Sequence, residues 1–138
     1  MTELDLTLRY KVEQRDAGLL EMAVRAAENA AKAKSDLKSG QIKALLRQVQ
    51  TGNGVEHICN WLRYQRAREP AWGKSGLFSA LLADIADLRT DAQTLTREIH
   101  PRQYEERLPA VWLALVQRYV AYLYRKFVAL KKGETDEE

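Results

Sequence analysis

Lysine and arginine side chains at helical spacing are the residues of this sequence whose chemistry stands out first. In residues 39–50, SGQIKALLRQVQ, Lys43 and Arg47 lie four apart, so both project from one face of a helix. The apolar residues of this stretch follow the i, i+3, i+4, i+7 spacing of another face, and the stretch contains no acid. The basic face either lies in water or holds a negatively charged partner.

The distribution of charge along the chain favours a negatively charged partner. Residues 38–68 hold six basic residues and one acid, and residues 108–133 hold five basic residues and no acid. The net charge of +3 includes four acids in the last six residues, GETDEE, without which 22 basic residues stand against 15 acidic ones. Charge separated in this way indicates a polyanion such as nucleic acid, although helices with unevenly charged surfaces would produce the same pattern.

Aromatic residues lie among the arginines of residues 60–72, NWLRYQRAREPAW. Proteins that bind single-stranded nucleic acid stack bases on aromatic rings and neutralise phosphates with basic side chains. Trp61, Tyr64 and Trp72 fit this use, but they also fit a hydrophobic core with the arginines on the solvent side. Trp61 follows Ile58 by three residues, so we expect Trp61 in the core.

The sequence contains no set of residues typical of an enzyme. It has no glycine-rich phosphate loop, no nucleophile elbow and no His-Glu-x-x-His helix. Asp84, Asp87 and Asp91 recur at helical spacing, but a metal site in a helical bundle takes carboxylates from several helices together with histidines. We therefore predict a solvated acidic face, with no catalytic residue, no metal and no cofactor.

The single cysteine and the two histidines also lack partners for chemistry. Cys59 has no second cysteine for an intramolecular disulfide, and its place between Ile58 and Asn60 predicts a buried structural thiol rather than a nucleophile. His57 and His100 are isolated, as is typical of histidines at a surface or a helix end.

The periodicity of apolar residues predicts an all-α fold, a compact bundle of five or six helices in a single domain over residues 1–132. Ser39 and Asn53 are suitable helix caps, residues 69–76 predict a loop, and Pro109 predicts a break or kink. Residues 133–138 predict a disordered acidic tail. The predicted helices cover residues 12–34, 40–50, 54–68, 77–99 and 110–132.

The two ends of the chain leave alternatives open. Residues 4–12 alternate apolar and polar side chains as in a strand, but Leu4, Leu8 and Val12 also fit a helix face; we favour a helix or a pliable N-terminal extended arm. Residues 110–132 are apolar almost all round, which indicates a helix at the centre of the bundle or one that meets a partner. The acidic residues near Met1 and the lack of a long apolar run predict a cytoplasmic protein.

Three segments, in order, resemble the small helical subunit of type III CRISPR–Cas effector complexes, of the Csm type. SGQIKALLRQV is similar to the Ser/Thr-x-Gln-Ile-Arg helix of that family, WLRYQRAR to its Leu-x-Tyr-x-x-Ala-Arg segment, and YVAYLYRKF to its closing Val-Ala-Tyr-His helix. Lys43 replaces the family's arginine, Leu123 replaces its usual histidine, and residues 93–112 make a longer connection. NGVEHICNWL resembles the Asn-Gly-Leu turn of the sister Cmr-type subunit, which stays an alternative.

The resemblance implies a non-enzymatic subunit that binds RNA independently of sequence. Copies of such subunits stack along the complex, next to its other protein subunits, and their basic faces contact the guide–target RNA duplex or the target strand. The alternatives are a helical protein–protein adaptor without direct RNA contact and, third, an enzyme with an unrecognised site. We expect an outward basic ridge that includes Arg68. The predicted RNA-binding residues are Lys43, Arg47, Arg63, Arg66, Arg68, Arg118 and Arg125.

Overall fold

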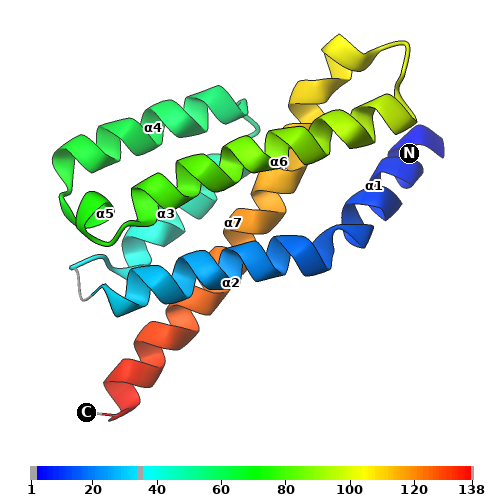
Figure 1. Cartoon of the computed structure of the whole chain (residues 1–138). Helices are drawn as coiled ribbons and strands as arrows, with labels where there is room; N and C mark the ends of the chain where they lie inside the picture. The colour runs from blue at the N-terminus through cyan, green and yellow to red at the C-terminus, as the bar shows by residue number, and fades with distance from the viewer. Residues whose placement is uncertain (1–2, 34–35, 138) are drawn as a thin grey trace.

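The computed structural model describes residues 3–33 and 36–137, and every regular element in these ranges is a helix. Figure 1 shows the long helices crossing one another in a bundle, with α7 running behind α2 and α6. The elements are α1 (Glu3–Gln14), α2 (Asp16–Lys32), α3 (Ser39–Gln50), α4 (Val55–Arg68), α5 (Ala71–Lys74), α6 (Leu77–Ile99) and α7 (Tyr104–Glu137).

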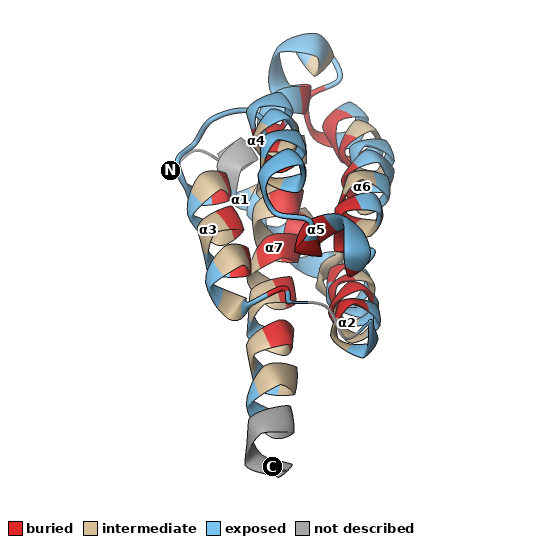
Figure 2. Ribbon diagram, turned by 90° about the vertical axis from the view of Figure 1, so that its left-hand side faces the viewer, coloured by how far each residue is buried: buried red, intermediate tan, exposed pale blue. Residues whose placement is uncertain are grey.

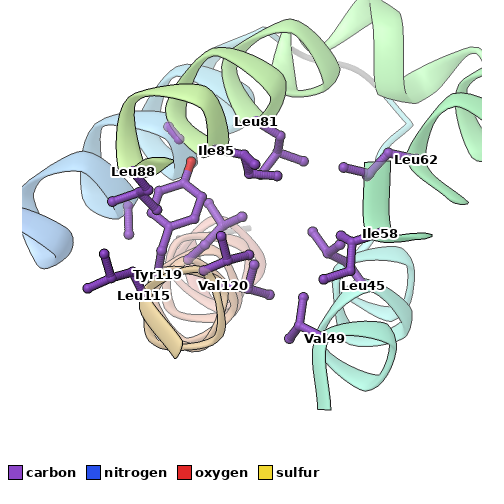
Figure 3. Packing of buried hydrophobic residues seen from close by; sticks show 14 of the residues in the cluster. Leu45, Val49, Ile58, Leu62, Leu81, Ile85, Leu88, Leu115, Tyr119 and Val120 are labelled. Carbon is purple, nitrogen blue, oxygen red and sulfur yellow. The ribbon is translucent and has the colours of Figure 1, made fainter. Parts of the chain in front are cut away.

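Helix α7 lies at the centre of the bundle and contacts α1, α2, α3, α4 and α6. Its residues Leu115, Val116, Tyr119, Val120, Leu123 and Phe127 are fully buried. Figure 3 shows side chains of α3 and α4 pointing toward those of α6 and α7 across this core. The apolar circumference of the last predicted helix is therefore explained by its central place, because neighbours cover it on several sides.

Two polar side chains of α7 hold it in register with its neighbours. Trp112 Nε1 donates to the carbonyl oxygen of Ile85 in α6 at 2.9 Å, and Gln117 Nε2 donates to that of Val49 in α3 at 2.8 Å. The Val49 carbonyl belongs to the last turn of α3, where no partner exists within the helix. Each bond satisfies a polar group at a half-buried contact and fixes how far α7 slides along the helix it touches.

Helices α3 and α4 form an antiparallel pair against one side of α7, and Figure 2 shows an exposed outer surface along α4. Gly52, with φ of 83°, provides the left-handed backbone needed to reverse the chain between them. The α3 start differs from the prediction: Ser39 is its first residue, and the Gln41 side chain accepts the Lys38 N–H at 2.8 Å. Gly54, not Asn53, is the residue before α4.

The N-terminal segment is a helix rather than an extended arm. Val12 is buried and Leu8 packs against the core, whereas Leu6 and Tyr10 are more than half exposed, which is the four-residue repeat of a helix. The single helix predicted over residues 12–34 is divided at Arg15 into α1 and α2. Its predicted end at residue 34 lies outside the described residues.

The described part of the chain forms seven helices, more than the five or six predicted, for local reasons. Residues 69–76, predicted as a loop, contain the short helix α5 with the fully buried Trp72. Pro109 lies inside α7, close to its start, where a proline removes one hydrogen bond and leaves the helix continuous. The break falls at residues 100–103 instead. Helix α7 runs to Glu137 and so enters the predicted tail, of which residue 138 lies outside the described residues.

Candidate nucleic-acid interface

Lys43 and Arg47 project from the solvent side of α3. Ile42, Leu45 and Val49 are fully buried and fix the inward face, and the two basic residues follow Ile42 by one and five positions. At 100° per residue, this places them on one flank, well away from the core. Both side chains are exposed, and neither forms an ion pair with any residue that the structure describes. Two positive charges one helical turn apart are therefore open to a ligand.

The three arginines of α4 have separate surroundings, although all are exposed. The Arg66 guanidinium lies 4.9 Å from the ring centroid of Phe78 in α6, which turns this side of α4 toward α6. The Arg68 guanidinium lies 5.5 Å from the ring centroid of Tyr64, and its Nη1 donates to the Tyr64 hydroxyl at 3.3 Å. Arg63 lies one turn after Cys59 and lowers the pKa of that thiol slightly against the larger effect of burial.

These five basic residues do not form the single ridge that the sequence predicted. Arg63 and Arg68 are five residues apart, which rotates them by roughly 140° around α4. Arg66 covers an aromatic ring of α6 and so points away from the solvent flank of α3. Two flanks result: one on α3 with Lys43 and Arg47, and one on the outer side of α4 with Tyr64 and Arg68. The prediction failed because the spacing within each helix says nothing about how neighbouring helices are rotated.

The two predicted arginines of α7 differ from one another. Arg118 Nη1 lies 2.8 Å and 3.0 Å from the two carboxylate oxygens of Asp16, and Nη2 lies 3.9 Å from Glu13. Its charge is therefore engaged by acids of α1 and α2, and we remove Arg118 from the candidate interface. Arg125 is exposed with its guanidinium 5.9 Å from the Tyr122 ring centroid, and no acid within the described part of the chain pairs with it.

Ion pairs divide the molecule into two regions. One, the ion-paired region, consists of α1, α2 and the parts of α6 and α7 that face them; it contains Lys11–Glu98, Arg15–Asp91, Arg25–Glu21 and the contacts of Arg118. The other, the basic helix pair, consists of α3 and α4. In the ranges described, no salt bridge involves a residue of the basic helix pair. Four basic residues of the first region are paired with acids, and the basic residues of the second are left for solvent or ligand.

The acidic residues of α6 take part in contacts within the protein. Tyr119 donates to Asp84 Oδ2 at 2.5 Å, and Asp91 lies 3.6 Å from Arg15. Burial raises the pKa of Asp84 despite the hydrogen bond from Tyr119, and burial together with that bond raises the pKa of Tyr119. Asp84 is therefore half-buried and not part of the wholly solvated face that we predicted. Over residues 3–33 and 36–137, no group of three or more potential ligands could hold a metal ion.

The thiol and the imidazoles occupy ordinary positions. Cys59 is half-buried, and burial raises its pKa, which disfavours the reactive thiolate at neutral pH. His57 is exposed on α4, and His100 is buried at the end of α6. None of the described helices has the length and apolar character needed to cross a membrane.

The aromatic residues of α4 and α5, which are close together in sequence, divide into core residues and an exposed residue. Trp72 is fully buried, and Trp61 packs edge-on against it with ring centroids 6.2 Å apart, as expected for core residues. Tyr64 is 55% exposed. The signal that distinguishes them is phase: Tyr64 follows the buried Leu62 by two residues and so points to the opposite side of the helix. Tyr64 and Arg68 are four residues apart, and this spacing is the sequence signal that joins them as a pair on one face of α4.

Comparison of the chain with protein-family models, with curated proteins and with solved structures found no match.

Proposed function

We propose that this protein is a non-catalytic RNA-binding subunit whose basic helix pair contacts RNA phosphates independently of sequence. The observation that carries the proposal is that none of the exposed basic residues of α3 and α4 has an acidic partner within the described ranges, whereas Lys11, Arg15, Arg25 and Arg118 of the ion-paired region have one. A protein that needed these charges only for its own stability would pair them. Unpaired lysines and arginines on a surface release counterions when they meet a polyanion.

We further propose that the subunit belongs to an RNA-guided effector complex of the type III CRISPR–Cas class. This part rests on the resemblance of three sequence segments to the Csm-type small subunit. In such a complex the guide supplies specificity by base pairing, so a subunit along the guide–target duplex needs phosphate contacts and no base-reading side chains. Lys43, Arg47, Arg63, Arg68 and Arg125 are the proposed contacts; other subunits and further copies of the chain are the proposed protein partners.

A protein-only adaptor is the alternative. It would dock a partner on the last helix, whose inward apolar side chains are buried in the bundle while Leu113, Tyr122 and Tyr124 are only partly buried. Purification after nuclease treatment distinguishes the two: the adaptor would keep a protein partner and retain no RNA, whereas the proposed subunit would bring along RNA protected by the complex.

Charge reversal on α3 tests the RNA-binding proposal directly. Lys43→Glu with Arg47→Glu should weaken binding of a labelled RNA roughly tenfold or more at about 0.1 M salt and lower the salt dependence, for every sequence tried. Arg102→Glu with Arg107→Glu is the matched control, because it makes the same change in net charge with exposed residues between α6 and the first turn of α7. Equal losses for the two double variants, or no loss for the first, would refute the assignment to α3.

A further inference from the structure

The outer face of α4 carries an exposed aromatic ring with a guanidinium over it. Tyr64 is 55% exposed, and the guanidinium of Arg68 lies 5.5 Å from its ring centroid. The 3.3 Å bond from Arg68 Nη1 to the tyrosine hydroxyl holds the two groups together. Because the residues are one turn apart on a regular helix, the pair is pre-formed and does not require a change of backbone.

Neither group of this pair has a function within the fold. Tyr64 lies outside the hydrophobic core, unlike Trp61 and Trp72. Arg68 has no acidic partner among the residues that the structure describes, although Glu69 follows it in sequence. The exposed ring of Tyr64 stays in contact with water and so gains no free energy from burial. The nearby Arg63 and, earlier on the same outer face, Asn60 and His57 add groups that can bind a phosphate or a sugar hydroxyl.

We propose that the Tyr64–Arg68 pair is a stacking platform for an unpaired base of single-stranded RNA. A base has a flat π-face that an aromatic ring or a guanidinium can cover, whereas the bases of a duplex are already stacked on one another and present only their edges and the phosphates. The pair therefore discriminates strand state, which phosphate contacts alone do not. This inference rests on the proposed RNA binding and adds which form of RNA the α4 face selects.

The same surface is poorly suited to reading sequence. Stacking on a ring tolerates any base, and the pair offers no fork of donors and acceptors in the plane of a bound base. A segment that leaves the guide–target pairing would be held at Tyr64, while Lys43 and Arg47 on the neighbouring helix contact phosphates. The α4 flank would thus stack a base and the α3 flank would bind phosphates of the same RNA strand.

Three probes of equal length separate stacking from charge: a labelled oligo(U), an abasic ribose-phosphate oligomer and an RNA duplex. Tyr64→Leu should weaken binding of oligo(U) by about fivefold or more and leave binding of the abasic oligomer and the duplex unchanged. Tyr64→Phe should retain wild-type affinity because it keeps the ring. Arg68→Lys, which keeps the charge and loses the planar group, should weaken oligo(U) by a smaller factor.

A matched control and a second measurement support these comparisons. Tyr10 on α1 is 60% exposed, and Tyr10→Leu should bind all three probes like the wild type. In the wild-type protein, the ring protons of Tyr64 should shift upfield by NMR when oligo(A) is added, since the ring current of a stacked adenine acts on them.

Each contrary result has a distinct meaning. If Tyr64→Leu binds oligo(U) like the wild type while the α3 double variant loses RNA, the platform is refuted and the proposed function stands. If Tyr64→Leu weakens the abasic oligomer or the duplex as much as oligo(U), Tyr64 does not act by stacking and the inference also fails. If the wild-type protein binds none of the three probes, the proposed function and the platform fall together.

Discussion

The ion-paired region and the basic helix pair use the same residue types in opposite ways. In the ion-paired region, Arg118 of α7 reaches Asp16 and Lys11 of α1 reaches Glu98 of α6, so charges join helices that are distant in sequence. In the basic helix pair, α3 and α4 are held by apolar contacts, one hydrogen bond from Gln117 and the contact of Arg66 with the Phe78 ring. The contrast indicates that ion pairs join helices on one side only and that most of the charge on the other side is available for binding.

This difference predicts that stability and RNA binding are affected by separate sets of substitutions. Truncating a core residue of α3 should lower the free energy of unfolding most. Replacing a residue of an ion pair should lower it less, and replacing a basic residue of α3 should hardly change it. The RNA affinity should follow the reverse order, provided that the protein remains folded.

Leu45→Ala should have the largest effect on stability. Leu45 is fully buried between α3, α4 and α7, and a leucine-to-alanine change in a core costs about 2–5 kcal/mol through lost burial and the cavity that remains. Urea denaturation followed by circular dichroism measures this cost. Leu20→Ala, at a leucine that is 47% exposed, is the control and should change stability by no more than about 0.5 kcal/mol. Similar costs for both would mean that α3 is not anchored by apolar packing.

Arg118→Gln should have an intermediate effect, restricted to stability. It removes a hydrogen-bonded ion pair with a third of the arginine side chain exposed, so we expect a loss of about 1 kcal/mol that shrinks as salt is added.

Lys43→Gln with Arg47→Gln should leave stability within about 0.5 kcal/mol of the wild type, because no acid is left unpaired. Denaturation curves at low and high salt, with RNA binding measured alongside, test both. A loss of RNA affinity in Arg118→Gln alone would restore that residue to the interface.

Asp84→Asn should have the smallest effect on stability, and the effect should be visible as a changed pH dependence. Because burial raises the pKa of Asp84 in the folded protein, the folded state holds its proton to higher pH than the unfolded state does. Stability should therefore fall as the pH rises from the ordinary carboxyl range through the raised pKa, and this loss should be absent in Asp84→Asn. Thermal melts across acidic pH compare the two proteins. A pH profile of Asp84→Asn that matches the wild type would show that this carboxyl does not contribute.

Properties that depend on a single helix, such as which of its faces is buried, could be predicted from the sequence. The repeat of Ile42, Leu45 and Val49 predicted the buried face of α3, and all three are fully buried. The strand-like alternation near the N-terminus left a strand, an arm and a helix open, because residues at i, i+4 and i+8 satisfy both periods. Only the packing of Leu8 and Val12 against the bundle decides between them.

Properties that depend on how helices are turned toward one another could not be predicted. Arg118 and Asp16 are 102 residues apart in sequence, so no spacing rule joins them. Arg66 lies over Phe78 because of the rotation of α4 against α6, which no pattern within α4 determines. The candidate RNA-binding residues therefore stay a prediction, and their expected geometry as a single ridge was wrong.

The central place of α7 also has a consequence during protein synthesis. Five of the other helices make contact with α7, yet α7 leaves the ribosome after all of them. Until then, the apolar faces of α2, α3 and α6 lack the surface that covers them. We therefore expect the complete core of the bundle to form only after α7 has emerged.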